Sequence, residues 1–149
     1  GAIAGLDALK AVKDELESVV LVTTKNPASL IGAPFFDGSD INPDKISEPT
    51  ILFEGVAKDA ISLFPKNVNV AALLSLVGLG NKDTSVRVIA DPNTNKNTHQ
   101  INAQGRFGKI SVTVENIPDD TNPKTSRLAT LSAIELLRQI CSKGLEIGT

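Results

Sequence analysis

The chain has 149 residues, a length that suits one domain with a core large enough to need no disulfide. Hydrophobic residues make up 41% and charged residues 21% of it, which excludes a disordered or fibrous protein. With a formal charge of −2, no basic run and only Phe as an aromatic residue, it lacks the features of a nucleic-acid-binding protein, and no apolar stretch is long enough to span a bilayer.

The first third of the chain predicts a helix, a strand and a long irregular segment. Apolar residues from Leu6 to Leu16 recur at near-helical spacing, which predicts an amphipathic helix over 5–17. Residues 18–24, SVVLVTT, are β-branched and apolar on both faces, typical of a strand inside a sheet. Residues 31–49 contain three prolines and two glycines. A loop of this length is uncommon unless it covers a site or a partner subunit.

Two helices are predicted in the middle of the chain. A short strand over 50–54 precedes a helix over 56–64, which Pro65 ends. The next helix, over 67–79, is apolar around most of its circumference. Such a helix belongs inside a protein or against a second one.

Three strands and a final helix complete the pattern. Alternation predicts strands over 86–91, 98–104 and 109–115, and the four-residue link 105–108 indicates a hairpin. The helix over 126–142 carries a wide apolar stripe that includes Cys141, which we expect to be a buried core thiol. We therefore expect one domain over 1–149, of class α+β or mixed α/β, with a mixed sheet of four to six strands covered by helices.

His99 is the only histidine, and it ends a polar run, ADPNTNKNTH, that leads into a strand. Strand parity places it with Ile101 and Ala103 on the apolar face. Partial burial there would keep the imidazole neutral and able to accept a proton, which suits a catalytic base. A hydrogen-bonded structural histidine fits the same position, so the residue pattern alone leaves both interpretations open.

Other polar residues give weaker signals. One histidine and one cysteine, without HxxH or CxxC spacing, provide no metal-ligand set, so we expect no metal. Gly78 and Gly80 resemble part of a dinucleotide-binding fingerprint, but they end a helix. The fingerprint ends a strand and opens a helix, so the motif is absent here. Asn69 lies in the first turn of an apolar helix, where it would either cap the helix or meet a ligand's amide.

Two residue counts concern the protein's origin. A single cysteine excludes an intrachain disulfide within these residues and fits a reducing compartment, so we expect the cytoplasm. The chain contains no methionine, even at position 1. We therefore expect it to be part of a longer polypeptide that holds another part of the site.

Long segments of the chain resemble the second domain of the L-aspartate dehydrogenases. These are GAIAGLDALKA from Gly1, LFEGVAKDAISLFPKNVNVAALLSLVGLG from Leu52, VIADPNTNKNTHQI from Val88 and VENIPDDTNPKTSRLATLSAIELLR from Val114. The resemblance implies an α+β domain like the catalytic domain of glyceraldehyde-3-phosphate dehydrogenase. It also implies a homodimer formed through the sheet side.

The resemblance further implies NAD- or NADP-dependent oxidation of L-aspartate to oxaloacetate, through iminoaspartate, in NAD biosynthesis. The family's catalytic histidine matches His99, and residues that touch its nicotinamide cofactor match Ala2 and Asn69. The covalently linked Rossmann domain that precedes this part in the family is absent from the chain. We therefore expect the chain alone to have little dehydrogenase activity.

The two carboxylates of aspartate require cationic or hydroxyl partners. The main candidates are Lys25, at the end of a strand, and Lys124, before the last helix. Thr23 and Asn97 are secondary candidates. Both lysines would equally fit solvated loops. Two alternative functions also stay open: a non-catalytic ligand-binding or dimerisation domain of related ancestry, and a dehydrogenase for another amino or oxo acid.

Overall fold

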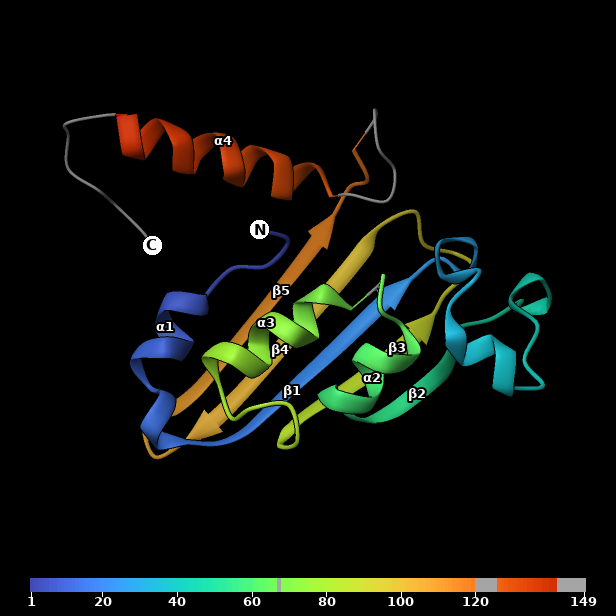
Figure 1. The fold of residues 1–149 in the computed structure, drawn as a ribbon, viewed down its shortest axis with the longest axis horizontal. Coiled ribbons are helices and arrows are strands. Elements are labelled where there is room, and N and C mark those ends of the chain that lie inside the picture. Colours follow the sequence, from blue (N-terminus) through green and yellow to red (C-terminus); the bar gives the residue numbers. More distant parts are fainter. Residues whose placement is uncertain (67, 120–125, 142–149) are drawn as a thin grey trace.

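A computed structural model describes residues 1–66, 68–119 and 126–141. Its centre is a five-stranded sheet in the order β2-β3-β1-β4-β5 (Figure 1). The strands are β1 (Leu16–Lys25), β2 (Thr50–Val56), β3 (Thr84–Ala90), β4 (Asn97–Gly105) and β5 (Gly108–Asn116). The helices are α1 (Leu6–Ala11), α2 (Ala57–Leu63), α3 (Asn69–Val77) and α4 (Arg127–Cys141).

The central strand, β1, pairs in parallel with β3 and antiparallel with β4. The other neighbouring pairs, β2 with β3 and β4 with β5, are antiparallel. This mixed sheet confirms the α+β class, and β4 and β5 form the expected hairpin. None of the described helices is long and apolar enough to cross a bilayer.

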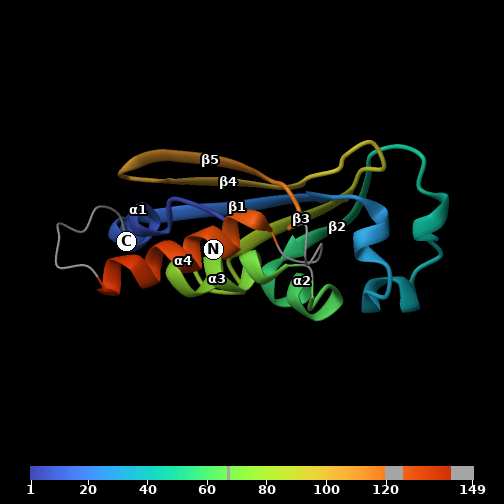
Figure 2. The same ribbon diagram turned by 90° about the horizontal axis from the view of Figure 1, so that it is seen from above.

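The described helices lie on one face of the sheet, and none of them covers the other face, which we call the open face (Figure 2). On the covered face, Leu21, Val88 and Ile101 are fully buried. On the open face, polar side chains such as Gln100 and Thr113 are exposed. This alternation follows from the two-residue period of a strand, which sends successive side chains to opposite faces.

Helix α3 runs antiparallel to β1 (Figure 1). A Cβ on Gly78, just after the helix, would lie 3.6 Å from Val19 and 3.8 Å from Leu16, at the amino end of β1. At 1.5 Å per residue the helix extends over about 13 Å, comparable with the rise from Val19 to Thr23. Its first residue, Asn69, is therefore directed toward the carboxyl end of β1.

The hairpin depends on a close approach at Gly105. A Cβ there would lie 1.8 Å from the carbonyl oxygen of Glu15, so no larger residue fits without moving the backbone. The adjacent Arg106 N–H donates to the same carbonyl at 3.1 Å. The end of β4 is thus fixed against the start of β1.

The segment over 31–49 is irregular, as expected, apart from short 3₁₀ turns at Pro34–Gly38 and Pro43–Lys45. Its Phe35 ring stacks on Phe64, with 5.1 Å between centroids. Phe64 follows α2 and is fully buried. The irregular segment over 31–49 is therefore anchored to the core at this aromatic pair.

Two expectations about helices were wrong. The first helix ends at Ala11, because Leu16 is buried in the sheet opposite Gly105 and so belongs to β1. Helix α4 forms as expected, but none of its residues is buried, and Cys141 is exposed. Helical periodicity indicates that a face requires an apolar partner, and within the described residues this face has none.

Candidate active site

His99 lies at the start of β4, on the covered face of the sheet. Its register partner on β1 is Thr23, and its partner on β5 is Val114. The His99 side chain points into the layer beneath the helices, and the residue is only 3% exposed. The expected apolar-face position, shared with Ile101 and Ala103, is confirmed.

A buried hydrogen bond joins His99 to Thr23. The Thr23 hydroxyl oxygen, Oγ1, lies 3.2 Å from His99 Nδ1, and Thr23 is fully buried. The bond orients the imidazole ring and leaves Nε2 as the nitrogen not engaged by Thr23. Which atom donates depends on the tautomer of the ring.

Lys25 lies two residues beyond Thr23 on β1 and therefore on the same face. It is 9% exposed, and burial lowers the pKa of its ammonium group. Within the described part of the chain, no salt bridge joins this ammonium to a carboxylate. A buried ammonium without an anionic partner is costly, and an anionic ligand would offset that cost.

The two basic groups are electrostatically coupled. Burial, and secondly the charge of Lys25, lower the pKa of His99 to about 4. At neutral pH the imidazole is therefore uncharged, which is the form that accepts a proton. An anion bound to Lys25 would weaken the second of these causes.

Asn97 and Ala2 lie at the same end of the sheet as His99. Asn97, half-buried, is two residues before His99 and pairs with Asn116 of β5. The Asn116 side chain is 2% exposed, and its Nδ2 donates to the Ala2 carbonyl at 2.8 Å. Asn116 Oδ1 is buried and has no hydrogen-bond partner among the described residues.

Asn116 is a residue that the sequence patterns did not single out. It continues the alternation of Ile110, Val112 and Val114, so a polar residue occupies an apolar-face position at the end of a strand. His99 gave the same signal on β4. The sequence signal for this site is therefore an asparagine or histidine at a strand position where the alternation predicts an apolar residue.

Asn69 is exposed at the first residue of α3. The N-cap of α3 is Val68, so Asn69 is not the N-cap, and no side chain among the described residues caps the helix. The direction of α3 places Asn69 toward the His99 end of the sheet. Lys124 lies outside the described residues. Among those described, no group of three or more His, Cys, Asp or Glu side chains could hold a metal ion.

Comparison with known families gives a match to a domain family. The family described as "Aspartate dehydrogenase, C-terminal" matches residues 7–140. The chain is also similar to L-aspartate dehydrogenases of Nitrosopumilus maritimus, with 62% identity over 149 residues, and of Methanocella arvoryzae, with 51% over 150. Each match covers the whole chain and 55% of the relative.

A solved structure is similar over the same extent. The crystal structure of aspartate dehydrogenase from Thermotoga maritima matches with a TM-score of 0.74 and 33% identity, covering 99% of this chain and 54% of that one. The chain thus spans about half the length of the curated relatives that it matches.

Proposed function

The chain belongs to the aspartate dehydrogenase family, whose C-terminal part it matches, and from this we propose that the longer protein oxidises L-aspartate. The products would be oxaloacetate and ammonia, formed through iminoaspartate, with NAD or NADP as oxidant and a role in NAD biosynthesis. One observation carries the proposal: a buried neutral histidine lies on the same sheet face as a buried ammonium without a carboxylate partner among the described residues.

His99 is proposed as the catalytic base. Oxidation removes a hydride from the substrate Cα and a proton from its amine, and water then adds to the imine before ammonia leaves. His99 would accept the proton, either from the amine or from the attacking water. To do so at Nε2, its ring hydrogen must lie on Nδ1 and be donated to Thr23 Oγ1. Thr23 then acts through His99, as a positioning residue.

Lys25 is proposed to bind a substrate carboxylate. Its ammonium is buried close enough to His99 to lower the pKa of the imidazole, so a carboxylate held there would lie near the base. Asn97, on the same face of β4, would donate a side-chain hydrogen bond to the substrate. Lys124 remains a candidate for the second carboxylate on the basis of its residue type.

The described residues fit the nicotinamide end of a cofactor. Two uncharged residues lie at the His99 end of the sheet. Ala2 is half-buried beside Asn116, and Asn69 is exposed at the first position of α3. When bound, the cofactor would supply the hydride acceptor. The sequence has no Gly-rich strand-to-helix turn for the phosphates. A preceding dinucleotide-binding domain in the longer protein would hold them, with residues 1–149 as the substrate-binding domain.

We also propose a homodimer formed through the open sheet face. No described helix covers that face (Figure 2). Its strands carry hydrogen-bonding side chains such as Gln100 and Asn102. We propose the cytoplasm as the compartment, on the basis of the single cysteine. Light scattering of the longer protein tests the dimer, and a monomer at micromolar concentration would contradict it.

A substrate comparison tests the proposed reaction. The longer protein should form NADH or NADPH with L-aspartate, and more slowly or not at all with glutamate, malate or homoserine. A preference for another of these acids would support the related-dehydrogenase alternative. Binding of cofactor or dicarboxylates without turnover would support the non-catalytic alternative. Either result would overturn the assignment to aspartate.

A further inference from the structure

Three polar residues form a row across the covered face of the sheet, at the carboxyl end of β1. Asn97 of β4 is the register partner of Asn116 of β5. Thr24 of β1 pairs with Thr98 of β4, so one further step along both strands brings Lys25 beside Asn97. We call Lys25, Asn97 and Asn116 the polar row.

The polar row lies next to His99 on the same face. His99 is two residues after Asn97 and pairs with Val114, which is two residues before Asn116. His99 and Asn116 are therefore diagonal neighbours, about 7–8 Å apart. Lys25, His99 and Asn116 are at most 9% exposed, so a ligand reaches any of them only when covering residues move. A small ligand bound by one of these groups would lie close to the others.

The Asn116 amide presents its oxygen as an acceptor without a partner. Its Nδ2 donates to the Ala2 carbonyl at 2.8 Å. If the amide were turned over, Oδ1 would lie against that carbonyl oxygen, so the hydrogen bond fixes the orientation of the amide. Oδ1 is buried and has no hydrogen-bond partner among the described residues. A buried acceptor without a partner costs free energy, which a donor on a bound ligand would recover.

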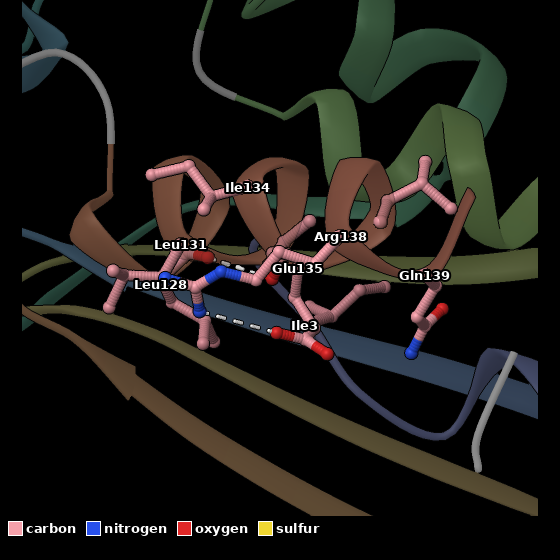
Figure 3. A pocket seen from close by; sticks show the side chains of 10 residues that line it. Ile3, Leu128, Leu131, Ile134, Glu135, Arg138 and Gln139 are labelled. Carbon is pink, nitrogen blue, oxygen red and sulfur yellow. Dashed lines mark hydrogen bonds and ion pairs between the residues drawn. The ribbon is translucent and has the colours of Figure 1, made fainter. Parts of the chain in front are cut away.

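The hollow beside α4 is a separate feature. It has a volume of about 740 Å³ and is lined by Gly1 and Ile3, the two neighbours of Ala2, and by residues of α4 such as Leu131 (Figure 3). Neither His99 nor any residue of the polar row lines it. The open acceptor therefore belongs to the candidate active site on the sheet and not to this hollow.

The substrate of the proposed reaction carries donors that match this acceptor. Its two carboxylates accept hydrogen bonds at neutral pH and so suit the ammonium group of Lys25. Its amino group, once neutral, has two N–H bonds to donate. His99 Nε2, which Thr23 does not engage, would accept one of them, and Asn116 Oδ1 would accept the other.

We propose that Asn116 Oδ1 accepts a hydrogen bond from the α-amino group of the substrate. As hydride leaves Cα for the oxidised cofactor, the nitrogen lone pair forms the C=N bond and positive charge develops at nitrogen. A fixed amide oxygen stabilises that charge. An uncharged acceptor suits the step, because a carboxylate would favour the ammonium form, which has no lone pair to form the bond. The inference rests on the proposed function and adds the group that recognises the amine.

Two ligands that differ in the amino group test this contact. Succinate is L-aspartate without its amino group, and neither turns over when the reduced cofactor is bound. Isothermal titration calorimetry of the full-length protein with NADH or NADPH gives the ratio of the two Kd values, which we call the amine preference. Asn116→Leu keeps a similar shape without an acceptor, and Asn116→Asp keeps an acceptor. Asn81→Leu, at an exposed asparagine before β3, is the matched control.

Asn116→Leu should lower the amine preference about 10-fold, the effect of one hydrogen bond to a charged group. Asn116→Asp and Asn81→Leu should retain the preference of the wild type. The Kd of the reduced cofactor, measured by its fluorescence, should not change in any variant. Circular dichroism checks the fold, and if the Leu variant does not fold, the Asp variant decides alone, because a lower preference there would also overturn the proposal.

Equal weakening of both ligands in Asn116→Leu would overturn the proposal, because it would indicate a role through the Ala2 contact only. A weaker cofactor affinity with an unchanged amine preference would overturn it as well, since the donor would then belong to the cofactor. A wild type that binds no L-aspartate would overturn both this inference and the proposed function. A wild type that oxidises L-aspartate, with an unchanged preference in the Leu variant, would overturn this inference alone.

Discussion

The hydroxyl of Thr23 lies 3.2 Å from Nδ1 of His99, so the central strand of the sheet directly orients the proposed catalytic base. Replacing Thr23 with Val keeps the side-chain shape and removes the hydrogen bond, which is worth about 1 kcal/mol. In the full-length protein, the Val variant should have a kcat about fivefold lower and a shifted pH dependence of kcat. A Thr23→Ser variant should keep the wild-type values of both. Equal activity of the Val and Ser variants would show that the bond does not position the ring.

His99→Gln should lower kcat for aspartate oxidation about 100-fold or more, because no other group replaces the proton acceptor. Glutamine retains hydrogen-bonding capacity in the buried position, so the variant should keep its fold. Circular dichroism checks this. Asp59→Asn, at an exposed residue of α2, is the control and should leave kcat unchanged. Full activity of His99→Gln would exclude His99 as the base.

Lys25→Met should raise KM for aspartate about 10- to 100-fold, the range expected when one charge-assisted hydrogen bond is lost. It should also raise the pKa of His99, because it removes the second of the two causes that lower it. The acidic limb of kcat/KM would then move to higher pH. Lys58→Met, at an exposed lysine of α2, is the matched control. An unchanged KM would remove Lys25 from the substrate site.

Stability should fall with acidification because of His99. Its pKa is about 4 in the folded chain and 6.5 in the reference state, so the unfolded chain binds the proton first. The contribution is complete above pH 6.5 and is lost as pH falls toward 4, by about 3 kcal/mol in all. Urea denaturation across this range should show a steeper decline for the wild type than for His99→Gln. Parallel curves would contradict the buried neutral state.

Gly105→Ala should destabilise the chain by about 3 kcal/mol, because its Cβ would meet the backbone of Glu15 at 1.8 Å and no side-chain rotation relieves that contact. Gly38→Ala is the control, since a Cβ there meets nothing within 4 Å. The midpoint of thermal unfolding measures both variants. A small effect at Gly105 would mean that the hairpin can move away from β1.

Local patterns were sufficient for part of the fold. The alternation in 98–104 and 109–115 predicted the hairpin, and parity alone placed His99 on the buried face beside Ile101. The family resemblance, carried by long segments, supplied the fold type. These features depend on residues that are close in the sequence or on extended similarity.

Features that depend on long-range pairing were not predictable. Thr23 and His99 are 76 residues apart, and only the register between β1 and β4 brings them together. The burial of Lys25 likewise follows from its position on the covered face, which a strand-end pattern leaves open. Cys141 was placed in the core because its helix is amphipathic, but no residue of α4 is buried by the described part of the chain.

Thr23 and Lys25 come from one strand, and His99 comes from its neighbour, so the site depends on the parity of two strands. If one residue of β4 before His99 were deleted and the strand positions stayed paired as before, each remaining residue would move by one position. The imidazole would then turn to the open face, and Gln100 would lie opposite Thr23. Changes in the length of the loop between Ala90 and Asn97 leave that parity intact. Natural length variation should therefore accumulate in this loop and be excluded from the two strands.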